Sequence, residues 1–168
     1  MVETVTDARG GIKRLAYNAA GQVTSYTDCS NRSTRFAYDS SGNLTSTTDP
    51  LGQSTHYQYD RNGRLLAVRY PDDSHAYYQY DPLGRLIGYT DPAGERTSYQ
   101  LDLDGQPLAR TNALGATLQY RYDSARRLAQ LVNENGAVYA FDYDKLDRLS
   151  SETGFDGSAT RYRYDATG

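Results

Sequence analysis

The sequence offers little with which to build a cross-linked or thiolate-ligated structure. Among its 168 residues there is a single cysteine, Cys29, and no tryptophan. One thiol cannot form an internal disulfide, and it cannot supply a thiolate-rich metal site. No segment approaches the roughly 20 consecutive apolar residues of a membrane-spanning helix. These absences exclude an internal disulfide framework, and we expect no membrane span.

An excess of charge of one sign is also lacking. Eighteen Lys and Arg residues oppose 21 Asp and Glu residues, for a net charge of -3. Nucleic-acid-binding domains usually carry a basic stripe, which this balance does not favour. Hydrophobic residues make up 38% of the chain, which is less than globular domains usually have. We therefore expect no nucleic-acid partner and no thick aliphatic core.

Tyrosine, by contrast, is abundant and regularly spaced. The chain contains 17 Tyr against 3 Phe, and seven of the tyrosines lie at multiples of 21 residues from one another. Leu101 occupies the one slot of this column that lacks an aromatic residue. The column consists of Tyr17, Tyr38, Tyr59, Tyr80, Tyr122, Tyr143 and Tyr164. Because 168 is eight times 21, we interpret residues 1–168 as a single repeat array of about eight units, the last one truncated.

Further positions of each repeat follow the aromatic residue in a constant order. An acid comes directly after it, except for Asn18 in the first copy, and the acids are Asp39, Asp60, Asp81, Asp102, Asp123, Asp144 and Asp165. Glycine stands four residues after the aromatic position at Gly21, Gly42, Gly63, Gly84, Gly105 and Gly168. Arg126 and Asp147 replace this glycine in two copies. A leucine or valine follows two residues later, so the unit is Tyr-Asp-x-x-Gly-x-Leu.

A second turn signal lies halfway between these copies. It is clearest in Thr-Asp-Pro-Leu-Gly at Thr48–Gly52 and Thr-Asp-Pro-Ala-Gly at Thr90–Gly94, with weaker versions ending at Gly10, Gly115, Gly136 and Gly157. Asp accepts a local backbone hydrogen bond, Pro presets the next φ, and Gly takes a positive φ. Both signals therefore predict hairpin corners of the type I turn plus bulge kind.

The segments between corners alternate with period two, as strands do. In one of them Thr55, Tyr57 and Tyr59 fall on one face, and Ser54, His56 and Gln58 on the other. A companion aromatic column lies two residues before the main one, at Phe36, Tyr57, Tyr78, Tyr99, Tyr120, Phe141 and Tyr162. Same-face neighbours of this kind stabilise a sheet by roughly 0.2 to 1 kcal/mol per pair. We predict an all-β chain with two strands per repeat and about sixteen antiparallel strands.

The number of strands leads to an expectation about shape. Sixteen strands at about 4.8 Å each would make a sheet roughly 75 Å wide. Strongly twisted open sheets rarely exceed about ten strands without curling. We therefore expect the hairpin repeats to form a curled sheet.

The register of Tyr59-Asp60-Arg61-Asn62-Gly63-Arg64-Leu65 and its copies resembles the YD-repeat or Rhs-repeat family. The resemblance covers about residues 6–168. It implies a segment of a hollow β-shell, as in Rhs polymorphic toxins, the C components of insecticidal toxin complexes, and teneurins. In bacterial members the shell encloses a C-terminal toxin domain, so the implied role is structural containment for delivery rather than catalysis.

The same resemblance implies partners and a location. The partners would be further repeats of the same parent chain and an enclosed C-terminal toxin domain, while secretion-spike proteins and glycans stay open. The location would be secreted or cell-surface, in a bacterium that uses a secretion system for delivery. We identify no self-cleavage segment, no toxin domain and no spike-docking module here. Because the chain stops within a copy of the motif, we expect it to be a fragment.

Candidate chemistry is sparse, and we predict no catalytic residue, no cofactor site and no metal site. His56 and His75 lie in different repeats and at different phases, so they suggest no paired ligands. Cys29 lies in a degenerate turn, and no base stands at a spacing that would indicate a catalytic nucleophile. The Asp column could be imagined as a calcium ladder, but turn capping explains it more simply. The Arg column (Arg64, Arg85, Arg127 and Arg148) is interpreted as a solvated face with weak charge pairs.

Two alternatives to a shell segment remain. A carbohydrate-binding or adhesion repeat module would also carry aromatic columns, although the absence of Trp and the order of the motif disfavour it. A hydrolase has no residue constellation to support it. Departures from the motif concentrate between residues 101 and 147, and Pro107 within a strand favours a bulge or an edge. We therefore expect the sheet to bend or open near Pro107.

Overall fold

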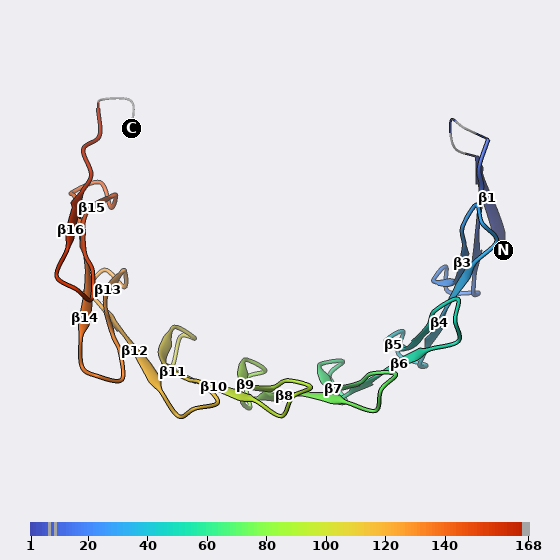
Figure 1. Ribbon diagram of the computed structural model, residues 1–168, viewed down its shortest axis with the longest axis horizontal. Helices are drawn as coiled ribbons and strands as arrows, with labels where there is room; N and C mark the ends of the chain where they lie inside the picture. The colour runs from blue at the N-terminus through green and yellow to red at the C-terminus, as the bar shows by residue number, and fades with distance from the viewer. Residues whose placement is uncertain (7, 9, 166–168) are drawn as a thin grey trace. The chain divides into compact units, whose positions relative to one another are not determined.

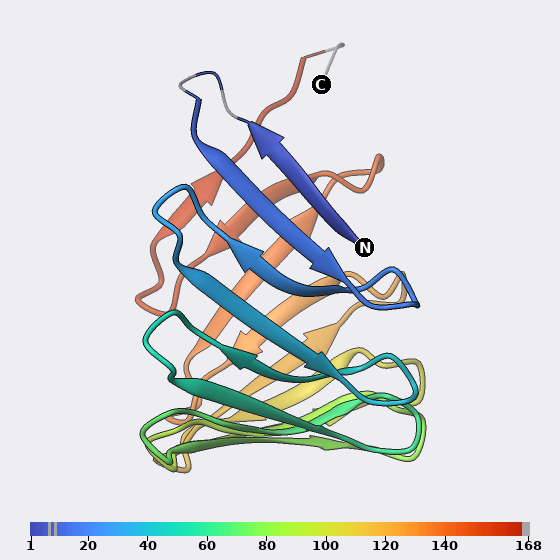
Figure 2. The same cartoon turned by 90° about the vertical axis from the view of Figure 1, so that its right-hand side faces the viewer.

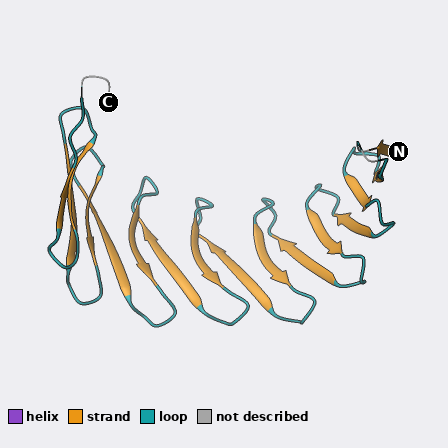
Figure 3. Cartoon of the chain, turned by 45° about the horizontal axis from the view of Figure 1, so that its top comes forward, coloured by secondary structure: helices purple, strands orange, loops and turns teal. Residues whose placement is uncertain are grey.

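The computed structural model describes residues 1–6, 8 and 10–165. Within these residues the chain consists of strands and turns without any helix, as Figure 3 shows. The predicted all-β class is therefore confirmed. It follows that the described part of the chain contains no helix long and apolar enough to cross a membrane.

The strands form one sheet in which spatial order equals sequence order. Sixteen strands are found in the described residues, and they follow one another from β1 to β16 without a crossover (Figure 1). Each pair with an assigned register is antiparallel, as in β1 with β2 and β14 with β15. The predicted array of consecutive hairpins is thus confirmed, and its curling stays a prediction.

The chain divides into two compact units. The first contains Met1–Gln79 and Thr90–Gly94. Its strands are β1 (Val2–Thr6), β2 (Ile12–Tyr17), β3 (Val23–Thr27), β4 (Ser33–Tyr38), β5 (Leu44–Thr48), β6 (Ser54–Tyr59), β7 (Leu65–Arg69) and β8 (His75–Tyr80). Figure 2 shows their turns alternating between two edges of the sheet.

The second unit contains Tyr80–Tyr89 and Glu95–Gly168. Its strands are β9 (Leu86–Thr90), β10 (Arg96–Leu101), β11 (Pro107–Thr111), β12 (Thr117–Tyr122), β13 (Leu128–Val132), β14 (Val138–Tyr143), β15 (Leu149–Thr153) and β16 (Ala159–Arg161). The single repeat array over residues 1–168 remains an interpretation of the sequence, as no boundary between functional domains follows from this division.

The hairpin corners have the geometry that their residues predict. In the turn between β4 and β5, the Gly42 N–H donates to the Asp39 carbonyl at 3.1 Å, and the Asp39 N–H donates to the Asn43 carbonyl at 2.9 Å. Gly42 has a φ of 88°, which only glycine adopts without steric cost. This is a type I turn followed by a glycine bulge, and it recurs at both kinds of corner.

A second irregularity recurs in the hairpins that carry the Tyr-Asp corner. In β4 and β5, Tyr38 pairs with Leu44 while Ala37 pairs with Ser46, so Thr45 is an extra residue. The same shift occurs between β2 and β3, β6 and β7, β10 and β11, β12 and β13, and β14 and β15. Such a bulge increases the local twist of a strand pair. The alternation of the sequence did not predict it.

Burial is thin, because the described strands lie in a single layer. The buried hydrophobic side chains of the described residues are small or β-branched: Ala67, Val68, Ala76, Ala109 and Val132. No large side chain there has less than 2% of its surface exposed. The expectation that the chain lacks a thick aliphatic core is correct. Its cohesion must therefore come from backbone pairing and from contacts along the surface of the sheet.

The corners provide a test of how much backbone conformation contributes to the free energy of unfolding. Gly52 has a φ of 85°, and a β-carbon added there would meet nothing within 4 Å. Gly52→Ala should therefore lower the free energy of unfolding by about 1 kcal/mol through conformation alone. Asp73 occupies a corresponding position with a φ of 62°, so Asp73→Gly should raise it by up to about 1 kcal/mol.

Urea denaturation of the chain monitored by circular dichroism measures both changes. Asp73 also pairs with Arg69 at 3.3 Å, but exposed pairs contribute little. Shifts of the same sign in the two variants would contradict the conformational explanation.

Candidate functional site

The acid of each Tyr-Asp corner closes its own turn. Asp60 Oδ1 accepts hydrogen bonds from the backbone N–H groups of Asn62 at 2.8 Å and Arg64 at 3.0 Å, and Asp60 Oδ2 accepts from Arg64 Nε at 2.6 Å. The same combination of backbone capping and ion pairing occurs at Asp123 with Arg127 and Asp144 with Arg148, and also at Asp28 with Arg32 in a corner of the second kind. The carboxylates are thereby engaged within their turns.

These contacts also set the acidity of the carboxyl groups. At Asp60 the backbone hydrogen bond from Arg64 is the main cause that holds the pKa below its ordinary value, with burial acting in the opposite direction. The pKa is lowered for the same principal reason at Asp28, Asp81, Asp123 and Asp144. At Asp39, where Asn43 replaces the arginine, the side-chain amide of Asn43 is the main cause. The described residues hold no group of three or more His, Cys, Asp or Glu suited to a metal ion.

The tyrosine of the motif connects consecutive repeats. The Tyr143 hydroxyl donates to the carbonyl oxygen of Leu128 at 2.8 Å, and Tyr38 donates to that of Val23 at 2.9 Å. Tyr122 and Tyr164 make the same bond to Pro107 and Leu149. In each case the acceptor lies 15 residues earlier, at the leucine position of the preceding motif. Tyr17 instead donates to the Glu3 carboxylate at 3.2 Å.

This bond explains why Tyr38, Tyr122, Tyr143 and Tyr164 are tyrosine rather than phenylalanine. Sequence reasoning treated the column as a set of packing residues and missed the hydroxyl contact. Two signals could have revealed it, namely 17 Tyr against 3 Phe and a leucine column at a constant distance. Phenylalanine would fill the same space but leave the carbonyl acceptor without this donor.

Two arginines of the column stack on tyrosines. The Arg127 guanidinium lies 4.6 Å from the centre of the Tyr143 ring, and that of Arg148 lies 4.3 Å from the Tyr164 ring. Each arginine therefore pairs with the aspartate of its own turn and covers the tyrosine of the next repeat. Arginine over an aromatic face is favourable by about 0.5 to 1 kcal/mol at exposed sites. The interpretation of a solvated face is corrected for Arg127 and Arg148, whereas the expected charge pairs are present along the column.

Where the tyrosine is replaced by Leu101, the arginine finds other acceptors. Arg85 Nη1 donates to the carbonyl oxygens of Asp102 at 2.8 Å and Leu103 at 3.2 Å. The link between one corner and the next is thus kept, although the ring is missing.

The remaining departures from the motif keep the geometry of the repeat. Pro107 begins β11, pairs with Leu101 across the usual bulge, and accepts the Tyr122 hydroxyl at 2.8 Å. The expected bulge is present. The sheet does not open at Pro107, because β11 pairs with both β10 and β12, and the expected bend stays a prediction. Arg126 and Asp147 adopt the positive φ of the glycine that they replace, 65° and 61°.

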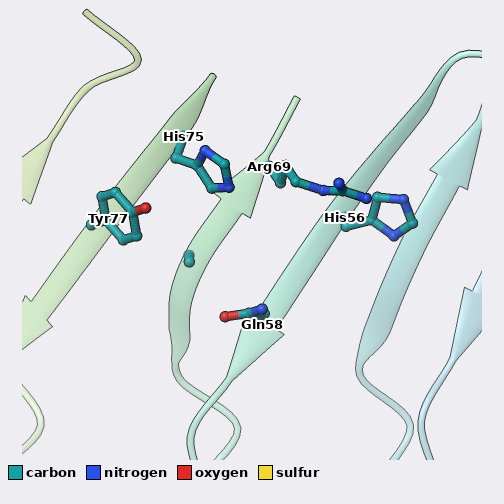
Figure 4. A pocket seen from close by; sticks show the side chains of 6 residues that line it. His56, Gln58, Arg69, His75 and Tyr77 are labelled. Atoms are coloured by element: carbon teal, nitrogen blue, oxygen red, sulfur yellow. The ribbon is translucent and has the colours of Figure 1, made fainter. Parts of the chain in front are cut away.

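The two histidines lie closer to one another than the sequence suggested. His56 in β6 pairs with Arg69 in β7, and Arg69 pairs with His75 in β8. The three side chains therefore share one face of the sheet, which the positions of the histidines in the repeat did not indicate. They line a hollow of about 390 Å³ together with Gln58, Ala67 and Tyr77 (Figure 4). Cys29 is exposed.

The geometry described so far agrees with a specific family. The family model described as the teneurin YD-shell matches residues 3–168. The chain belongs to the YD-shell family. No curated protein matches it in sequence.

Solved structures support the same architecture. A crystal structure of TcdB2-TccC3-Cdc42 matches with a TM-score of 0.70 and 17% identity, over 86% of this chain and 9% of that one. A crystal structure of TcdB2-TccC3-TEV gives a TM-score of 0.61 at 18% identity, over 97% of this chain and 12% of that one. The Photorhabdus luminescens Tc holotoxin pore with the TccC3-D651A mutation gives 0.62 at 17% identity, with coverages of 97% and 12%. The YD-shell chain thus shares the fold of these proteins and spans a small part of their length.

The hydroxyl contact between repeats can be tested by a conservative change. Tyr143→Phe should lower the free energy of unfolding by about 1 kcal/mol, because the Leu128 carbonyl loses its donor. Tyr120→Phe is the matched control, since Tyr120 is also a half-buried strand residue and its hydroxyl has no hydrogen bond found among the described residues. Chemical denaturation of both variants checks the expectation. Equal losses in the two would mean that the hydroxyl contact adds nothing.

The capped carboxylates predict a loss of stability in acid. Asp144 has a folded-state pKa below its ordinary value of 3.8, chiefly because the Arg148 N–H donates to it. A lowered folded pKa means that this stabilisation is complete above the ordinary value and is lost as the pH falls through the folded one. The melting temperature should therefore be level at neutral pH and fall in the acid range below 3.8.

Asparagine separates the two contributions of this carboxylate. At the equivalent position, Asn18 Oδ1 accepts the N–H groups of Ala20 and Gln22, both at 3.0 Å. Asp144→Asn should keep the turn and weaken the acid dependence, whereas Asp144→Ala should lower the melting temperature at every pH. Thermal melts from pH 2 to 7 would show this, and an unchanged acid transition in Asp144→Asn would speak against it.

Proposed function

We propose that this chain is a wall segment of a YD-repeat shell that encloses a C-terminal toxin domain for delivery. The observation that best supports this proposal is the strand order: the described strands of each unit pair only with their sequence neighbours. A chain built in this way makes a surface that extends repeat by repeat. It is suited to separating two spaces rather than to surrounding a small ligand.

The surface chemistry is compatible with containment. The described strands leave both faces of a single-layer sheet accessible, and the buried side chains are small or β-branched. The opposite faces differ, since the motif tyrosines and leucines lie on one and Ser, Thr, Arg and His side chains recur on the other. A polar wall would limit adhesion of an unfolded cargo, because it offers little apolar surface to hold it.

The proposal is of a structural and not a catalytic protein. The polar side chains of the Tyr-Asp corners are engaged in turn closure and in contacts between repeats. The hollow around Arg69 is the feature that most resembles a site. Its lining residues do not include a nucleophile and a base oriented by a third group. We place the full-length protein outside the cytoplasm, secreted or at the cell surface, as the family resemblance implies.

Electron microscopy of the natural full-length protein tests this function. We expect a closed hollow body with density inside it, formed by further repeats of the same chain. Deleting the region that follows the repeats should remove the internal density and leave the shell intact. An open rod, or a closed body whose interior is unaffected by the deletion, would contradict containment.

A further inference from the structure

Two corners of the described sheet contain an asparagine that is followed by glycine. Asn62-Gly63 lies in the corner between β6 and β7, and Asn135-Gly136 lies in the corner between β13 and β14 (Figure 1). All four of these residues are exposed. Glycine has no side chain to hinder the approach of its backbone nitrogen. The other asparagines of the chain precede larger residues, and they are Asn18, Asn31, Asn43, Asn112 and Asn133.

An asparagine before glycine is open to attack by the backbone nitrogen of that glycine. At Asn135, the nitrogen of Gly136 forms a bond to the side-chain carbon Cγ, and the side-chain amide leaves as ammonia with the proton of the attacking nitrogen. A cyclic succinimide remains, and water opens it at either of its two carbonyl carbons. One opening gives aspartate, and the other gives isoaspartate, in which the main chain runs through the β-carbon. Water is the only co-reactant.

The closed corner opposes this attack. The Gly136 N–H donates to the carbonyl oxygen of Asn133 at 2.9 Å, and the Gly63 N–H donates to that of Asp60 at 3.1 Å. The glycine nitrogen must leave this hydrogen bond before it can reach the asparagine side chain. The rate of deamidation therefore follows the fraction of time for which each corner is open.

The corner that contains Asn62 is held by charge and by a neighbour. Asp60 accepts the backbone N–H of Asn62 at 2.8 Å and the Arg64 Nε at 2.6 Å. A β-carbon at Gly63 would lie 3.3 Å from Oδ1 of Asn43, which belongs to the preceding Tyr-Asp corner. Opening this corner therefore breaks a charge-assisted hydrogen bond and displaces a neighbouring side chain.

The corner that contains Asn135 has a neutral closure. Asn133 Oδ1 accepts the N–H groups of Asn135 at 3.0 Å and Ala137 at 2.9 Å. Ala137 stands where the other corner has Arg64, so it offers no guanidinium to the capping residue. A β-carbon at Gly136 would meet nothing within 4 Å. Because hydrogen bonds between neutral groups are weaker than charge-assisted ones, this corner opens more often.

We propose that Asn135 is a site of spontaneous deamidation and isoaspartate formation in the folded protein. The closure of the turn sets its rate, in addition to the Asn-Gly sequence. Isoaspartate adds a carbon atom to the backbone of a corner that joins Val132 directly to its partner Val138. The modified corner gains a negative charge and loses its tight closure. This chemistry is independent of the containment function, because it requires only one corner and water.

Peptide mapping by mass spectrometry tests the site in the folded chain and in the chain unfolded by guanidinium chloride. Both samples are incubated at neutral pH and physiological temperature. In the folded chain we expect Asn135 to deamidate about tenfold faster than Asn62, because its closure is neutral. In the unfolded chain the two rates should be nearly equal. Equal rates in the folded chain, or an Asn135 that stays intact while the unfolded chain reacts, would overturn the proposal.

The repeat supplies a variant that closes the corner more firmly. The double variant Asn133→Asp and Ala137→Arg recreates the pair of Asp28 and Arg32, which closes a corner of the same kind with hydrogen bonds of 2.9 Å from the Arg32 N–H and Nε. It should fold as the natural chain does and deamidate at Asn135 about tenfold more slowly. An undiminished rate in the folded double variant would refute the role of the closure.

The matched control makes the same exchange at a corner that lacks the Asn-Gly step. Asn112 Oδ1 accepts the N–H groups of Leu114 and Ala116, both at 3.0 Å. The double variant Asn112→Asp and Ala116→Arg should therefore leave the rate at Asn135 unchanged. A slower rate at Asn135 in this control would mean that added charge or overall stability, rather than the local closure, sets the rate.

Amide hydrogen exchange tests the consequence for the corner. The Ala137 N–H, which donates to Asn133 Oδ1, should exchange several-fold faster in aged protein that contains isoaspartate than in fresh protein. The Ala116 N–H serves as the internal reference, because its corner is unmodified, and it should exchange at the same rate in both samples. Equal protection of Ala137 before and after ageing would contradict the loss of closure.

Discussion

The structure depends on a tight turn, which at most of the described corners is capped by the carboxylate or amide side chain of its first residue. In each corner the fourth residue has a positive φ, and its backbone N–H donates to the carbonyl oxygen of the first residue. This geometry aligns the two flanking strands in a single register. A slip of one residue would turn every side chain to the opposite face. Because each hairpin then serves as the edge for the next, an error at one corner would be passed along the sheet.

Contacts along the surface take the place of a core. The tyrosine hydroxyl reaches the carbonyl of the preceding motif, and an arginine covers the ring while pairing with its own aspartate, as in Arg127 with Asp123 and Tyr143. Each contact contributes little to the free energy of unfolding on its own, but the same kinds of contact recur along the array. The stability of such an array is approximately a sum of units and of their interfaces. This explains how a chain with 38% hydrophobic residues folds at all.

Much of the fold could be predicted, because the physics of a repeat is local. Glycine at constant spacing marks positive φ, aspartate before it marks a capped turn, and period-two alternation between corners marks strands. Apart from the one at Pro107, the bulge at Thr45 and its counterparts escaped prediction, since a single extra residue leaves the alternation on either side intact. The hydroxyl contact of Tyr143 escaped too, because its acceptor is a backbone carbonyl, which carries no residue type.

The sequence by itself determined the period, the turn chemistry, the all-β class and the family, since these depend on residues close together in the chain. Only the tertiary structure decided which side chains meet across strands. His56 and His75 lie 19 residues apart at different phases of the repeat, yet the two registers of β7 place Arg69 between them. The physical reason is that cross-strand neighbours are set by the sum of loop lengths and bulges. An unpredicted bulge therefore changes which residues share a face.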